Sequence, residues 1–244
     1  MQAGMQVPPL GKVNKIIIGA TIGLFILSSI LEKTSGVSLT SQLGLSFSSF
    51  FSGHIYQLFT YPWMSHGLIS VIFNSLILWF LGSEFESSWG FRRYLYFIVF
   101  SAVGGGIIFL IVGMILFQGG GVVANFPLSG LSGVCSALCL AYAIINPDRM
   151  FTFMLLFPMK AKYFCMILIG IELYQGFFSP AAVLSWGHLG TMGAGYGMLL
   201  LFSRKSISAP GFLKNIKKQK RVPKNSHLKI VKDDDEDDSP KYFQ

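Results

Sequence analysis

A serine flanked by glycines is the first feature of this chain that could do chemistry. Gly130, Leu131, Ser132 and Gly133 stand at the start of an apolar run, 131–145, that predicts a membrane-buried helix. A polar side chain is expensive in hydrocarbon, so the Ser132 hydroxyl is a candidate functional group. The glycines would let a substrate or another backbone approach that hydroxyl closely. The alternative is a packing motif, because small residues are common where membrane helices touch.

Two further polar side chains could complete an acyl-transfer site around Ser132. His188 is near the start of the last apolar run, and Asn74 lies in the first two turns of an earlier one. Serine, histidine and asparagine are the nucleophile, general base and oxyanion donor of such a site. Taken singly, His188 and Asn74 are more simply interpreted as hydrogen-bonding contacts between helices. The catalytic interpretation therefore requires that the chain bring all three to one level.

The composition is that of a membrane protein. Of the 244 residues, 52% are hydrophobic and only 12% are charged, about half the charged fraction of an ordinary soluble domain. The mean hydropathy is +0.57. Apolar runs at about 16–30, 68–81, 94–117, 131–145, 163–178 and 183–202 predict six transmembrane helices. The first run has no clear small-residue cleavage site after it, so we expect a retained span and not a signal peptide.

The basic residues predict the orientation of these spans. They flank alternate connections, as Lys12 and Lys15, Arg92 and Arg93, Arg149, Lys160 and Lys162, and Arg204 and Lys205. The connections 118–130 and 179–187 carry no charged residue, so the basic clusters and both termini are predicted to be cytoplasmic. Runs two, four and six then enter from outside, which puts Asn74, Ser132 and His188 at similar depth. That agreement favours catalysis over packing.

The chain divides into three predicted regions. They are a cytoplasmic N-terminal segment, 1–13, a six-helix membrane domain, 14–203, and a cytoplasmic tail, 204–244. Eleven of the 19 Lys and Arg lie after residue 203, so most of the basic residues belong to the tail, and nucleic-acid binding is disfavoured. The basic part of the tail could lie on anionic lipid, and its acidic block, 233–238, is expected to be disordered. The external connection 32–67 is rich in aromatic residues and predicts a loop in the outer interface.

Other residues within the runs carry less specific signals. Cys135, Cys139 and Cys165 fit small core hydrophobes and not a disulfide framework or a metal site. Glu172, the one mid-run carboxylate, should be protonated, hydrogen-bonded or facing water. A hydrogen bond to a neighbouring helix is its simpler role, and orienting substrate or water in the site is the alternative.

The last run is unusually rich in glycine. Its glycines are Gly187, Gly190, Gly193, Gly195 and Gly197, of which Gly193 and Gly197 are four residues apart. They predict a glycine-rich face that packs closely on the fourth run. Such packing would bring His188 within reach of Ser132. Since no clear acidic partner is evident for a triad, the sequence predicts a Ser132–His188 dyad.

In these features the chain resembles the rhomboid family of intramembrane serine proteases, over about residues 14–203. Gly130-Leu131-Ser132-Gly133 matches the family's G-x-S-G motif, and His188 with Gly195 is similar to its histidine helix. Further similarity lies in Leu58-Phe59-Thr60-Tyr61, in Asn74 with Leu81-Gly82, Glu86 and Gly90, and in Phe157-Pro158 before Lys160-Ala161-Lys162-Tyr163.

The resemblance implies an all-α, polytopic, six-transmembrane-helix bundle with an interfacial loop after the first helix. It implies no cofactor, no metal and no nucleic acid, and cleavage of single-pass transmembrane substrates near their outer ends. The protein would be an integral, multi-pass protein of the bacterial cytoplasmic (inner) membrane. Membrane lipids would therefore be partners as well. His188 would activate Ser132, and Asn74 with the Ser132 backbone N–H would bind the oxyanion. Gly130, Gly133 and Gly195 would pack the helices near the site.

Several positions depart from the family pattern. Ser70 stands where a histidine is common, four residues before Asn74, and His66 is one residue away from the usual upstream histidine. Both are candidates for supporting roles, Ser70 toward the oxyanion. Tyr56-Gln57, Ser136 and Thr191 also replace more usual residues. One alternative is therefore a catalytically weak or inactive relative that binds transmembrane helices, and another is a small transporter, which a single mid-run carboxylate makes less attractive.

Overall fold

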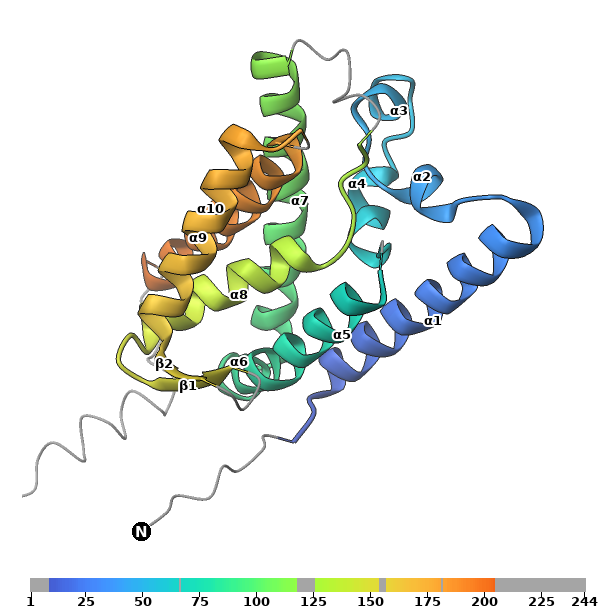
Figure 1. Ribbon diagram of the computed structural model, residues 1–244. Helices are drawn as coiled ribbons and strands as arrows, with labels where there is room; N and C mark the ends of the chain where they lie inside the picture. Colours follow the sequence, from blue (N-terminus) through green and yellow to red (C-terminus); the bar gives the residue numbers. More distant parts are fainter. Residues whose placement is uncertain (1–8, 66, 118–125, 154–156, 181, 205–244) are drawn as a thin grey trace, which may run out of the picture. The chain divides into compact units, whose positions relative to one another are not determined.

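Each of the six apolar runs forms a helix in the computed structural model, which describes residues 9–65, 67–117, 126–153, 157–180 and 182–204 (Figure 1). The helices are α1 (Lys12–Ser35), α5 (Leu68–Ile77) continued by the π-helical η2 (Leu78–Gly82) and α6 (Ser83–Trp89), α7 (Phe91–Phe117), α8 (Ser132–Ile145), α9 (Ala161–Phe178) and α10 (Ala182–Arg204). All described residues belong to one unit, Met1–Ile207. The predicted tail lies outside them from residue 205 onward.

Length and composition mark part of this bundle as membrane-spanning. Among the described residues, Lys12–Ser35, Leu68–Trp89 and Phe91–Ile115 are long and apolar enough to cross a bilayer. The apolar helix Ser132–Ile145 is shorter. The helical nature of the six runs is confirmed, and the chain has the apolar helices of an integral membrane protein. That all six helices cross the membrane stays a prediction.

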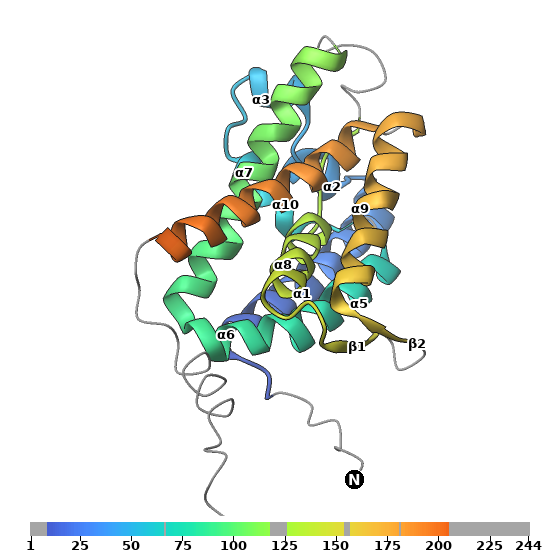
Figure 2. The ribbon, with the colours of Figure 1, turned by 90° about the vertical axis from the view of Figure 1, so that its left-hand side faces the viewer.

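Helix α8 is surrounded by the others. Ten of its 14 residues are buried, and it contacts α5, η2, α7, α9 and α10. In Figure 2, α8 runs through the middle with α9 and α10 on either side of it. A helix enclosed by protein does not need a lipid-facing apolar belt of full bilayer length, which accounts for its shortness.

Glu86, in the middle of α6, is hydrogen-bonded to the first turn of α1. The Glu86 carboxylate accepts the N–H groups of Val13 (3.0 Å) and Asn14 (3.3 Å) and the Asn14 side-chain amide (3.1 Å). The Tyr94 hydroxyl donates to Asn14 Oδ1 at 2.7 Å. The first N–H groups of a helix have no intrahelical partner and favour a negative charge, so Glu86 caps α1 from another helix.

The connection between α1 and α5 carries short helices: α2 (Leu39–Leu43), α3 (Phe47–Phe51), α4 (Gln57–Thr60) and the 3₁₀ turn η1 (Tyr61–Trp63). Gln57, 1% exposed, donates to the carbonyl of Gln42 (3.0 Å) and accepts the N–H of Ser46 (3.3 Å). The Tyr61 hydroxyl donates to the carbonyl of Ala102 in α7 at 2.6 Å. Phe51, Tyr56 and Phe59 are exposed, as an interfacial loop requires, although the membrane position of this loop stays a prediction.

The all-α prediction is wrong for one connection. Between α8 and α9, strands β1 (Met150–Phe153) and β2 (Phe157–Lys160) pair antiparallel, from Met150 opposite Lys160 to Phe153 opposite Phe157. Alternating aromatic and β-branched residues favour such a hairpin, but a stretch of four residues is too short to show the pattern in a sequence.

The hairpin lies at the basic end of the bundle. Arg149 pairs with Glu84 of α6, and Asp148 with Lys162 of α9 at 3.0 Å. Both ion pairs involve residues that follow the C-terminal end of α8, and Ser132 is at the other end of that helix.

Candidate active site

Gly130 directs the chain into the helix that begins with Ser132. Its φ of +89° is in the region that favours glycine, and a Cβ there would lie 3.3 Å from the carbonyl oxygen of Met64. The Gly130 N–H donates to the carbonyl of Tyr61 at 2.9 Å. Two bonds between Leu45 and Leu128, 2.9 and 2.7 Å, attach the same segment to the first connection. The loop after α1 therefore fixes the position at which α8 starts.

Ser132, the first residue of α8, is hydrogen-bonded to Asn74 of α5. The Asn74 Nδ2 donates to Ser132 Oγ at 3.2 Å, and Asn74 is only 5% exposed. The Cys135 thiol donates to the Asn74 carbonyl at 3.7 Å, a second link between the two helices. Because Ser132 Oγ is the acceptor from Asn74, its own proton remains available for a base.

The start of α8 also offers backbone donors. The first intrahelical bond runs from the Cys135 N–H to the Leu131 carbonyl at 2.8 Å. The N–H groups of Ser132, Gly133 and Val134 precede it and have no intrahelical acceptor. They carry the partial positive charge of a helix N-terminus, which favours an anion beside Ser132.

His188 of α10 packs against the residue that follows Ser132. Its Cδ2 lies 3.3 Å from the point where a Cβ on Gly133 would be. No hydrogen bond joins Ser132 and His188, both of which are described. His188 Nδ1 instead lies 2.9 Å from Glu172 Oε1 of α9, with side chains 22% and 16% exposed. The predicted site residues Asn74, Ser132 and His188 thus come from three helices and meet at the start of α8.

The glycines of α10 act differently from the prediction. Gly193 and Gly197 have nothing within 4 Å of an added Cβ, so this pair is not part of the predicted close face. Gly195 is the close neighbour of α8, with an added Cβ 3.0 Å from the Cβ of Ala137. Gly190 faces Ile108 of α7 at 2.6 Å. The four-residue spacing of Gly193 and Gly197 therefore does not identify which glycines of α10 contact a neighbouring helix.

Ser70, His66 and the cysteines were the remaining candidates. Ser70 is exposed, one turn before Asn74, and has no hydrogen bond to Ser132 in the described chain. His66 lies outside the described residues. The three cysteines are buried and free. The described residues contain no group of three metal-binding side chains.

Two contacts of the site escaped the sequence interpretation. Thr191 packs against both Gly105 of α7 and Gly133 of α8, where an added Cβ would collide with its hydroxyl. Its only signal was that it replaces a glycine of the family pattern. Glu172 and His188 were each singled out, but their contact was not predicted, because nothing in an apolar run shows which face turns toward α10.

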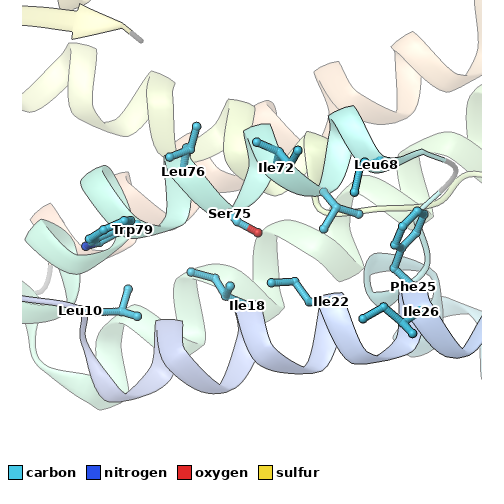
Figure 3. Close-up of a pocket in the computed structure, with 11 residues that line it drawn as sticks. Leu10, Ile18, Ile22, Phe25, Ile26, Leu68, Ile72, Ser75, Leu76 and Trp79 are labelled. Carbon is cyan, nitrogen blue, oxygen red and sulfur yellow. The ribbon is translucent and has the colours of Figure 1, made fainter. Parts of the chain in front are cut away.

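A groove of about 390 Å³ lies elsewhere, between α1 and α5 (Figure 3). Its lining is apolar apart from Ser75, which points into it next to Ile18 and Ile22 of α1. Ser75 is the neighbour of Asn74 along α5, so adjacent residues turn toward different helices. The groove is therefore separate from the cluster around Ser132.

A family model described as the Rhomboid domain matches residues 52–205. The matched stretch includes Asn74, Ser132, Glu172 and His188. No curated protein matches the chain.

Proposed function

The chain belongs to the rhomboid family, and we propose that it is an intramembrane serine endopeptidase with Ser132 as nucleophile and His188 as general base. One observation carries the proposal. Asn74, Ser132 and His188, from three different helices, converge where α8 begins and where backbone N–H groups have no intrahelical acceptor. A packing motif would not require a donor on the Ser132 hydroxyl and an imidazole against the next residue, Gly133.

The proposed reaction begins with attack of Ser132 Oγ on the carbonyl carbon of the scissile peptide. His188 Nε2 takes the hydroxyl proton and then gives it to the leaving amine as the C–N bond breaks. A water that His188 deprotonates hydrolyses the resulting ester, and the proton returns to Ser132 Oγ. No cofactor or metal is needed for these steps.

The oxyanion of each tetrahedral intermediate would lie against the start of α8. Asn74 Nδ2 has two hydrogens, one of which now bonds Ser132 Oγ, and the N–H groups of Ser132 and Gly133 are the backbone donors. Ser70 has no part in this assignment, because it is exposed and no hydrogen bond joins it to Ser132 in the described chain.

The proposed substrates are single-pass transmembrane proteins, cut near the outer membrane face. The cluster lies at the opposite end of α8 from Arg149, which pairs with Glu84, and the positive-inside rule puts that basic end in the cytoplasm. Both termini would then be cytoplasmic, with the protein in the bacterial inner membrane.

A second candidate function is a rhomboid relative that binds transmembrane helices without cutting them. The missing hydrogen bond between Ser132 and His188 favours it, since a nucleophile is normally within hydrogen-bond reach of its base. Catalytic hydrogen bonds are often long before substrate binds, so this geometry is also compatible with an active enzyme.

A fluorophosphonate probe separates the two functions. In detergent micelles the full chain should be labelled and should cut a reporter transmembrane helix, whereas Ser132→Ala should do neither while keeping its melting temperature. Replacing a hydroxyl by hydrogen leaves the packing almost intact. Equal labelling and cleavage by Ser132→Ala would refute the nucleophile, and a wild type that binds the helix without labelling or cleavage would establish the non-cutting relative.

A further inference from the structure

Among the described residues, Glu172 is the acidic side chain that pairs with His188. Its Oε1 lies 2.9 Å from His188 Nδ1, and the two side chains come from different helices, α9 and α10. Its second oxygen, Oε2, is buried and has no hydrogen-bond partner in the described chain. Of the two carboxylate oxygens, only Oε1 has a hydrogen-bond partner among the described residues, and that partner is His188.

The two edges of the His188 ring face different helices. Nδ1 faces Glu172 of α9, while Cδ2 lies against Gly133 of α8. Nε2 is bonded to Cδ2 and is the nitrogen remote from Glu172. The ring thus contacts the carboxylate through Nδ1, and its Nε2 lies on the edge that faces the start of α8.

A carboxylate on Nδ1 has a defined effect on an imidazole. It accepts the proton of Nδ1–H, which fixes the tautomer whose Nε2 lone pair is free to act as a base. It also stabilises the imidazolium that forms once Nε2 has taken a proton. Both effects operate on the step that the proposed function assigns to His188.

We propose that Glu172 is a positioning residue for His188, so that the site works as a Ser132–His188–Glu172 relay and not as a dyad. The inference rests on the proposed function. It replaces the simpler role of Glu172 as a contact between helices.

Neutral hydrogen bonds already join α9 to α10 close by. Ser185 Oγ donates to Gln175 Oε1 at 3.4 Å, one turn beyond Glu172, and Trp186 Nε1 donates to the Gly176 carbonyl at 3.0 Å. Holding two helices together does not need an ionisable group, which is costly to bury. The carboxylate is thus unnecessary for packing and useful for the histidine.

The test compares Glu172→Gln with Gln175→Leu, which removes a packing contact of the same helix pair. We expect Glu172→Gln to lower kcat for a reporter transmembrane helix and the rate of fluorophosphonate labelling at least tenfold, with KM within twofold and an unchanged melting temperature. Gln175→Leu should lower the melting temperature and leave kcat within twofold. A kcat for Glu172→Gln within threefold of wild type would overturn the relay.

A second measurement needs no change at Glu172. The ¹⁵N spectrum of histidine-labelled full chain, with the signal identified by its loss in His188→Gln, should show Nδ1 protonated and Nε2 unprotonated. The opposite tautomer would overturn the relay even if Glu172→Gln failed to fold. Failure of the proposed function would look different, because the wild type itself would then not react with the probe.

Discussion

Gly133 of α8 faces Thr191 of α10 so closely that no side chain fits between them. A Cβ on Gly133 would lie 2.7 Å from Thr191 Oγ1 and 3.1 Å from Thr191 Cβ. Thr191 is 1% exposed, and its hydroxyl donates to the Gly187 carbonyl at 2.9 Å, so it has little room to withdraw. The separation of Ser132 from His188 therefore depends on glycine at position 133.

Gly133→Ala should lower kcat/KM for a reporter transmembrane helix at least tenfold. The new methyl would push α8 away from α10 and would also meet the His188 ring at 3.3 Å. Overpacking of this kind typically costs about 1–3 kcal/mol, so the melting temperature should fall as well. Cleavage kinetics and thermal unfolding in the same detergent measure both effects.

Two controls separate this contact from a general effect of alanine on a helix. Gly193→Ala places its methyl where nothing lies within 4 Å, and its activity should remain within twofold of wild type. Thr191→Ala, added to Gly133→Ala, removes the nearest atom and should restore activity at least threefold. A double variant no better than Gly133→Ala alone would show that the Thr191 contact is not the cause.

Asn74→Ala should lower kcat by about 10²–10³-fold, the usual cost of losing one oxyanion donor, with little change in KM. The Asn74 carbonyl that the Cys135 thiol contacts is retained, so the link between α5 and α8 is only partly lost. Ser75→Ala is the matched control, because Ser75 is the next residue along α5 and points into the groove toward α1. If Asn74→Ala kept more than a third of wild-type kcat, Asn74 would not be an oxyanion donor.

The sequence predicts that Asn74 and Ser132 lie at similar depth, and it does not predict the hydrogen bond between them. Basic residues orient the helices, and the distance of each polar group from its helix end gives its level. The contact of Glu172 with His188 depends instead on rotation. Exposed apolar residues such as Ile171 and Leu173 flank Glu172 on α9, so an apolar run gives no pattern that identifies the face toward α10.

Helix packing shows the same limit. The spacing of Gly193 and Gly197 is a sound signal for a close helix contact in general, yet Gly195 makes the contact with α8 and that pair makes none. The glycine that matters is decided by the crossing of α10 over α7 and α8, and a single sequence does not contain that angle.

Gln57→Ala should destabilise the first connection. Gln57 is the buried group that joins the Gln42 carbonyl to the Ser46 N–H, and its loss leaves both without this partner at about 1–3 kcal/mol each if they stay buried. Activity should fall with stability, because this connection holds Gly130 through the Tyr61 carbonyl. Thermal unfolding and cleavage measure the two effects. Gln42→Ala removes an exposed side chain from the same loop and should change neither, so equal losses in both variants would contradict the role of Gln57.

The orientation of the bundle can be tested independently of catalysis. Cys135, Cys139 and Cys165 are first replaced, since all three are buried thiols. A single cysteine at Ser41 should then react with a membrane-impermeant maleimide in intact cells, because Ser41 is exposed in the connection that holds the start of α8. A single cysteine at Ser87 should react only after permeabilisation, because Ser87 is exposed on α6 beside Glu84, which pairs with Arg149 at the basic end. The reverse pattern would place Ser132 and His188 near the cytoplasmic face, and substrates would then have to be cut near their inner ends.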